Sequence, residues 1–162
     1  MYTVFSVGDK VVYPMHGAGV IEAIEEREVL GQRDQYYIMR LSVGDMKVMV
    51  PSSSAEEVGL RPVLGREEVP DVYDVLRGEK TAMSQNWNRR YRANMEKMKT
   101  GDIYTVAEVV RNLGIRDREK GLSTGERRML ENAKQILSSE LSIVEQKSSE
   151  EVIKGIEAIL SE

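Results

Sequence analysis

The alternation of hydrophobic and polar positions predicts a sheet in the first part of the chain. Between residues 5 and 51, short β-branched runs are separated by turns rich in glycine and proline, at 14–19, 30–32 and 43–45. Such runs predict four or five strands, and the short turns predict antiparallel neighbours. Strands packed so closely in sequence favour a small, strongly bent sheet or barrel. The serine-rich segment 52–62 breaks the pattern and indicates an irregular connection.

After residue 62 the apolar positions recur at spacings of three and four, which is the period of an α-helix. Five amphipathic segments follow one another, and Asp102, Ser123 and Ser148 stand where helices begin. A glutamate three residues after each serine completes a capping-box pattern. We therefore predict an α+β protein with an antiparallel β domain over residues 1–62 and a compact helical domain over 63–162.

The segment 84–101, SQNWNRRYRANMEKMKTG, holds the only tryptophan of the chain beside three arginines. On a helix, Trp87, Tyr91, Met95 and Met98 share one stripe, and the arginines 89, 90 and 92 lie around it. An aromatic ring among guanidinium groups suits a nucleic-acid surface, because cations neutralise phosphates while the ring stacks on or wedges between bases. From spacing alone, however, a tryptophan on such a stripe more often packs in the core.

Alternation in the run 46–50, MKVMV, places Met49 on the opposite face from its two valines. An exposed methionine on an edge strand is an adaptable contact for a partner protein, although the alternation does not say which face is inside.

The net charge of −4 argues against a nucleic-acid-binding protein, but the distribution of charge along the chain favours one. Residues 81–130 carry 11 basic and six acidic side chains, whereas each of the flanking segments carries more acidic than basic ones. A basic segment between acidic ones is expected of a protein that contacts nucleic acid with one part and protein with another. A solvated helical surface would show the same charges.

Composition argues against most catalytic and metal-binding classes. The chain has no cysteine and a single histidine, His16, which lies in a turn-rich connection. Cysteine-based or histidine-rich metal sites are therefore excluded, and we expect no catalytic residue, no metal and no cofactor. No apolar run reaches the length of a membrane span and no secretory leader is apparent, so we expect a cytoplasmic location.

Several motifs in order resemble the CarD/CdnL family of bacterial transcription regulators. They are VGDKVVYPMHGAGVIEAIEE, YYIMRLSVGDMKVMVP, VGLRPVL, WNRRYRANMEKMKTGD, AEVVRNL and GLSTGERRMLENAKQIL, spread over about residues 5–145. The front part also resembles the polymerase-interaction module of the transcription-repair coupling factor, although the chain has no motor motif.

The resemblance implies a Tudor-like or SH3-like domain that binds the β subunit of RNA polymerase, with Arg27, Met49 and Pro51 at the contact positions. Some relatives carry arginine where this chain has Met49, so an apolar contact is expected there. The resemblance also implies that the helical domain contacts promoter DNA at the upstream edge of the transcription bubble. In that role Trp87 would act as a wedge, and Arg89, Arg90 and Arg92 would hold phosphates.

Three hypotheses therefore compete. The first is a non-enzymatic polymerase accessory factor that stabilises open promoter complexes, binds DNA largely without sequence preference, and acts as a monomer at the nucleoid. The second is a protein–protein adaptor with Trp87 packed inside a structural helical domain. The third, an enzyme, lacks any nucleophile–base or metal grouping in the sequence. Neither a small-molecule substrate nor a membrane partner is expected.

Overall fold

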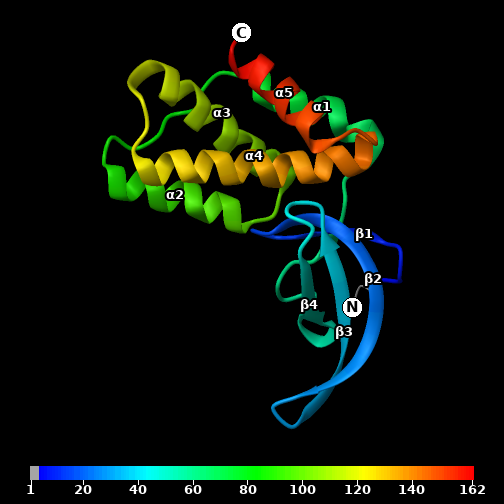
Figure 1. Cartoon of the computed structure of the whole chain (residues 1–162). Helices are drawn as coiled ribbons and strands as arrows, with labels where there is room; N and C mark the ends of the chain where they lie inside the picture. Colours follow the sequence, from blue (N-terminus) through cyan, green and yellow to red (C-terminus); the bar gives the residue numbers. More distant parts are fainter. Residues whose placement is uncertain (1–3) are drawn as a thin grey trace.

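The computed structural model describes residues 4–162 and shows a five-stranded antiparallel sheet followed by five α-helices, which confirms the predicted α+β class (Figure 1). The strands are β1 (Lys10–Tyr13), β2 (Gly17–Val29), β3 (Gln32–Leu41), β4 (Lys47–Pro51) and β5 (Arg61–Pro62). Their order in the sheet is β4-β3-β2-β1-β5, so β4 and β5 form its two edges.

A long hairpin of β2 and β3 dominates the sheet and projects away from the helices (Figure 1). Its turn places Leu30 and Gly31 at positive φ, +53° and +78°, the combination that a two-residue type I′ turn requires. The register of β2 against β3 shifts between Ile21 and Ala23, and such irregularities bend and twist the bulged strand. Because β4 is short, the end of the hairpin has no third strand beside it.

The segment 52–62 was predicted to be an irregular connection, and this prediction was wrong in part. Ser52–Ser54 form a 3-10 turn, and Arg61–Pro62 pair with β1 as β5. Ala55 and Leu60 are buried in the core of the β domain, at 3% and 6% exposed. The segment closes the sheet, and its two-residue strand depends on a distant partner that no local pattern reveals.

The helices are α1 (Val69–Arg77), α2 (Trp87–Lys99), α3 (Ile103–Lys120), α4 (Thr124–Glu145) and α5 (Ser149–Leu160), preceded by a 3-10 turn at Arg66–Glu68. Asp102 accepts a hydrogen bond from the amide of Tyr104, as its predicted capping role requires. Ser123 and Glu126 form the predicted capping box, and Ser148 accepts from the amide of Glu151. Each cap satisfies amides that the helix itself leaves unpaired.

The five helices bury one continuous apolar core, which the predicted stripes supply. Helix α3 is its centre, with Val106, Ala107, Val110 and Leu113 at 3% exposed or less. The core of the β domain is a separate cluster built around Ile21, Met39, Leu41 and Val50. Within residues 4–162, no helix combines the length and the apolar character that a membrane span requires.

Candidate nucleic-acid and protein interfaces

Trp87 opens helix α2 and lies at the surface. Its side chain is 41% exposed, its ring stacks on that of Tyr91 with centroids 5.0 Å apart and planes 16° apart, and its Nε1 donates to Ser123 Oγ at 2.8 Å. Tyr91 and Met95 are partly buried and only Met98 is fully so. The predicted stripe therefore runs from the surface into the core, with Trp87 at its exposed end.

Two helix starts hold this ring in place. Asn86 caps α2 by accepting from the amide of Arg89 at 3.0 Å, and Ser123 caps α4 while it accepts from the indole. A Cβ at Gly125 would lie 3.5 Å from the Trp87 ring and 3.6 Å from the Tyr91 ring. Both distances are ordinary van der Waals contacts, so the two rings lie directly against the first turn of α4. Trp87 is thus oriented by three contacts while part of its ring stays open to solvent.

Arg90, which sequence reasoning grouped with the surface arginines, is buried. It is 4% exposed and forms an ion pair with Glu126, whose own side chain is 3% exposed; Arg90 Nε to Glu126 Oε2 is 2.7 Å. Arg90 Nη1 also donates to the carbonyls of Ser84 and Gln85. Burial raises the pKa of Glu126, but the hydrogen bonds and charge of Arg90, with the hydrogen bonds of Ser123, hold it below its ordinary value. Arg90 therefore joins α2 to the start of α4 inside the helical domain, and the predicted phosphate contact by Arg90 is wrong because its guanidinium group is buried.

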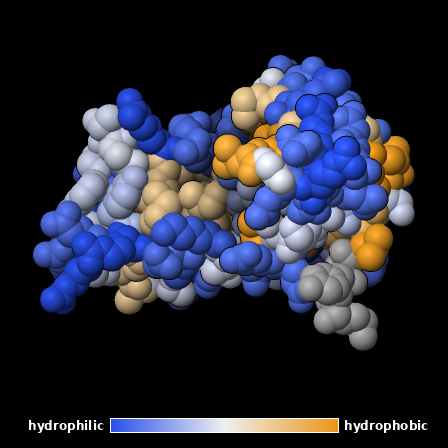
Figure 2. All heavy atoms as spheres, turned by 90° about the horizontal axis from the view of Figure 1, so that it is seen from below, coloured by the Kyte–Doolittle hydropathy of each residue, from blue (hydrophilic) through white to orange (hydrophobic). Residues whose placement is uncertain are grey.

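Arg89 and Arg92 are exposed on α2 as predicted. Sequence reasoning gave no role to two further exposed arginines, Arg127 and Arg128, in the first turns of α4 next to the cap that holds Trp87. Arg127 lies 3.7 Å from Asp117 of α3. The positive end of a helix disfavours cations, so tandem arginines there were a signal in the sequence. The beginnings of α2 and α4 lie together at one end of the helical domain (Figure 1), and this end is strongly hydrophilic in Figure 2.

The three predicted polymerase-contact residues lie on one face of the β domain. Strand pairing sets Arg27 against Asp34, Pro51 against Tyr36, and Met49 against Ile38. Asp34, Tyr36 and Ile38 alternate along β3, so all three pairs project to the same side of the sheet. The core residues Tyr37, Met39 and Val50 belong to the other side. Arg27 and Met49 are exposed, and Pro51 is partly buried.

This outer face combines apolar and charged groups next to a free sheet edge. Met49 is 42% exposed on β4, which within residues 4–162 has a neighbouring strand on one side only. Arg27 pairs with Glu25 at 2.6 Å. Asp34 accepts hydrogen bonds from Ser52 and Ser53, and these, led by that from Ser53, lower the pKa of Asp34. An edge strand with an adaptable methionine can accept an extended segment of another protein.

No candidate metal centre accompanies these two faces in the part of the chain that the structure describes. Within residues 4–162, no three histidine, cysteine or acidic side chains gather in a way that could hold a metal ion. His16 is exposed, and its ring lies against that of Tyr13 with centroids 4.3 Å apart and planes tilted by 37°. Its Nδ1 is 3.1 Å from the carbonyl oxygen of Pro14.

Comparisons with known proteins cover nearly the whole chain. The family described as "CarD-like/TRCF RID domain" matches residues 5–64, and "CarD, C-terminal domain" matches residues 71–157. The chain is 43% identical over 152 residues to "Putative transcription factor YdeB" of Bacillus subtilis (strain 168), with 94% of both chains covered. A solved structure described as "CdnLNt from Myxoccoccus xanthus" is 42% identical over 40% of this chain and 90% of that one, with a TM-score of 0.33.

The fold is that of an α+β protein whose sheet and helices are each matched by a separate family model. Together with the 43% identical relative, these two matches show the family: the chain belongs to the CarD family of non-enzymatic proteins.

Proposed function

We propose that this protein is a transcription factor that binds the β subunit of RNA polymerase with its β domain and stabilises open promoter complexes with its helical domain. The observation that carries the proposal is Trp87, a ring 41% exposed yet held in a fixed orientation beside exposed arginines. The relative's printed name, a transcription factor, and the family's RID domain support the setting.

On the polymerase side, the outer face of the β domain supplies the contact. Arg27, Met49 and Pro51 project to one side of the sheet, and the open edge of β4 offers backbone groups for pairing with a strand of the β subunit. Met49 would contribute apolar area where an ion pair is absent. The flanking charges of Arg27 and Asp34 would set the register of the contact more than its affinity.

On the DNA side, Trp87 is the wedge, and Arg89 and Arg92, joined by Arg127 and Arg128, are the phosphate contacts. A fixed ring inserted at the junction between duplex and melted strands opposes closure of the bubble, and phosphate contacts position it without reading sequence. Because the whole chain carries a net charge of −4, its DNA affinity without polymerase should be weak. Tethering through the β domain raises the local concentration of the helical domain at the fork, so weak affinity is sufficient.

The adaptor hypothesis placed Trp87 in the core. The ring lies outside it, and only the far end of its stripe, at Met98, belongs to it. A stabilisation of about 1.4 kcal/mol would change the ratio of open to closed complexes about tenfold, which one stacked ring and a few phosphate contacts can supply.

The decisive experiment measures the lifetime of open complexes formed by purified polymerase on a GC-rich promoter, with wild-type protein, Trp87→Ala and no factor. We expect the wild type to lengthen the lifetime and Trp87→Ala to lose most of that effect while it still retains polymerase in a pull-down. Asn88→Ala, an exposed neighbour on the same helix turn, is the matched control and should behave as wild type.

A wild type that neither binds polymerase nor changes the lifetime would overturn the proposal. If Trp87→Ala matched the wild type, the wedge would be excluded and the effect would rest on tethering alone.

A further inference from the structure

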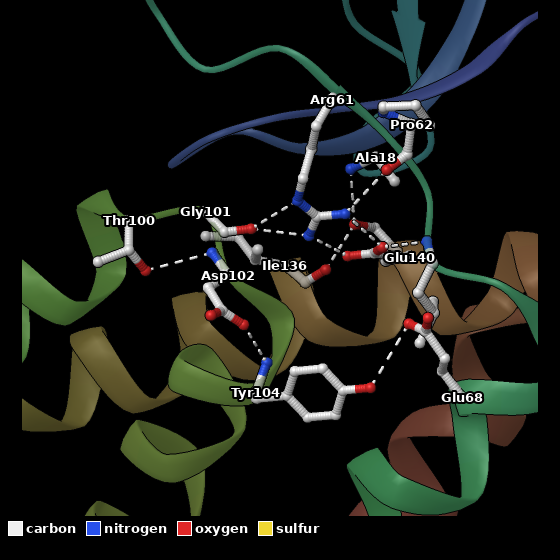
Figure 3. Close-up of polar contacts among 12 residues, drawn as sticks. Ala18, Arg61, Pro62, Glu68, Thr100, Gly101, Asp102, Tyr104, Ile136 and Glu140 are labelled. Atoms are coloured by element: carbon white, nitrogen blue, oxygen red, sulfur yellow. Dashed lines mark hydrogen bonds and ion pairs between the residues drawn. The ribbon is translucent and has the colours of Figure 1, made fainter.

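The two domains meet at an ion pair whose glutamate is buried and whose arginine is 29% exposed. Arg61, on strand β5, donates from Nη1 and Nη2 to the two carboxylate oxygens of Glu140 on α4, at 2.8 and 2.7 Å (Figure 3). The side chain of Glu140 is only 4% exposed, and it also accepts from the amide of Leu64 at 2.8 Å. Glu140 therefore binds both Arg61 and Leu64, in the segment that leads from the sheet to the helices.

Arg61 also reaches a third element. Its Nε and Nη2 donate to the carbonyl oxygen of Gly101, at 2.9 and 2.7 Å, in the turn that joins α2 to α3 (Figure 3). A second link lies close by, where Ser139 Oγ of α4 accepts from the amide of Ala18 at the start of β2, at 2.9 Å. We call the group of Ala18, Arg61, Gly101, Ser139 and Glu140 the junction.

The backbones approach each other closely at the junction. A Cβ at Gly17 would lie 2.9 Å from Ser139 Oγ, and one at Gly101 would lie 2.7 Å from the ring of Pro14. The void beside Arg61, Gly101 and Glu140 has a volume of only about 10 Å³, near the minimum that one water molecule needs. Larger hollows of about 170 and 400 Å³ border the same contact, so the close packing is confined to the junction itself.

Neither domain needs the junction for its own core. The apolar cluster of the sheet and that of the helices are separate, and Arg61 and Glu140 belong to neither. A buried ion pair adds little net stability, because desolvation offsets much of the attraction, but it can select one arrangement over others. The junction is thus better suited to fixing the geometry between domains than to folding either one.

We infer that Arg61, Ser139 and Glu140 are positioning residues that lock the polymerase-binding sheet and the Trp87 surface into one rigid body. The inference rests on the function proposed above. Gly101 follows the C-terminal end of α2, and Trp87 stands at the other end of this 13-residue helix. That helix is about 18 Å long, so a tilt of about 10° at the junction would displace Trp87 by about 3 Å. Since functional groups must be held within about 0.5 Å and 10–20°, a loosened junction would misplace the wedge.

The test begins with Arg61→Glu, which sets two carboxylates against each other at the junction. Arg77→Glu, an equal charge change at a half-exposed site on α1, is the matched control. Amide hydrogen exchange at Ala18 and Leu64, whose N–H groups donate across the junction, reports whether it has opened. We expect Arg61→Glu to bind polymerase as wild type and to keep the Trp87 emission spectrum, but to extend open-complex lifetime about tenfold less.

A disulfide that joins the two domains again separates the effect of their geometry from the effect of the changed charge. The Cβ positions of residues 17 and 139 are 3.6 Å apart, within the range of a disulfide, and the chain has no cysteine of its own. Gly17→Cys with Ser139→Cys is therefore added to Arg61→Glu, and the protein is oxidised before it meets polymerase. Residue 17 has φ of +107°, so a cysteine there is strained whether it is oxidised or reduced. The oxidised form is therefore compared with the reduced form of the same variant.

The oxidised triple variant should regain most of the wild-type lifetime effect, and the reduced form should not. The inference would be overturned if the junction amides of Arg61→Glu exchanged faster and this variant still extended open-complex lifetime as much as the wild type. Failure of the confirmed disulfide to restore activity would also overturn it. A wild type without any effect on lifetime would instead overturn the proposed function, so the two failures are distinguishable.

Discussion

At the scale of single residues, the arginines of helix α2 are of two kinds, buried and exposed, and their positions in the sequence do not show which is which. Arg90 is buried against Glu126, whereas Arg92, two positions later, is exposed. Removal of one partner of a buried pair leaves the other charge uncompensated, at a cost of about 3–5 kcal/mol. We expect Arg90→Ala to lower the free energy of unfolding by about that amount, and Arg92→Ala to change it by less than about 0.5 kcal/mol. Urea denaturation followed by Trp87 fluorescence measures both, and equal effects would contradict the assignment.

The same pair makes stability depend on pH. The pKa of Glu126 is lowered below its ordinary value of 4.5, because Arg90 and Ser123 stabilise the ionised form more than burial penalises it. A group with a lowered folded-state pKa contributes stability above its unfolded pKa, and this is lost as pH falls from about 4.5 through the folded value. Glu126→Gln should be less stable than wild type at neutral pH and should lose less stability between about pH 5 and about pH 3. Parallel profiles of unfolding free energy against pH would contradict this.

Sequence identified Trp87, Arg89 and Arg92 as surface candidates but could not separate Arg90 from them. The helical stripe fixes which residues share a side of α2, not what packs against them. The partner of Arg90 lies 36 residues away, on a helix whose position depends on the whole helical core. The capping box of Ser123 and Glu126 was predictable because it is local; that its glutamate also neutralises an arginine of α2 was not.

At the scale of elements, strand β4 carries a prediction about polymerase binding. Met49 lies within β4 on the outer face and Met46 lies just before the strand; they are 42% and 55% exposed. Both can therefore be replaced without loss of the core. We expect Met49→Asp to weaken binding to the polymerase β subunit by about tenfold, that is about 1.4 kcal/mol, and Met46→Asp to have less than a third of that effect in free energy. Titration with the purified subunit measures both, and a larger loss for Met46→Asp would move the contact away from β4.

Long periodic elements were predictable and short paired ones were not. Each of the five helices carries its own apolar stripe, and Asp102, Ser123 and Ser148 mark the starts of three of them, so their existence followed from local pattern alone. Strand β5 has two residues, one of them a proline, and forms only because β1 offers a partner. Its residue Arg61, hidden in a segment that resembled a linker, also anchors the junction, since its partners Gly101 and Glu140 follow 40 and 79 residues later.

At the scale of the whole molecule, two separate apolar cores that are joined at the junction predict how the protein unfolds. Among residues 4–162, the helical cluster contains 18 buried residues and that of the sheet nine, so the sheet alone is the less stable unit. If the junction couples them, wild-type protein should lose both in one transition. Once Arg61→Glu uncouples them, the β domain should unfold at lower urea than the helical domain.

Two probes report the two cores independently. Trp87 is the only tryptophan and its ring contacts lie within the helical domain, whereas amide hydrogen exchange of β3 follows the sheet. Coincident midpoints are the established test of a single cooperative transition. We expect the two midpoints to coincide in wild type and in Arg77→Glu, and to separate in Arg61→Glu with that of the sheet moving lower. Separate midpoints already in wild type would show that the junction orients the domains without coupling their stability, because a contact can select a geometry and still contribute little free energy to either core.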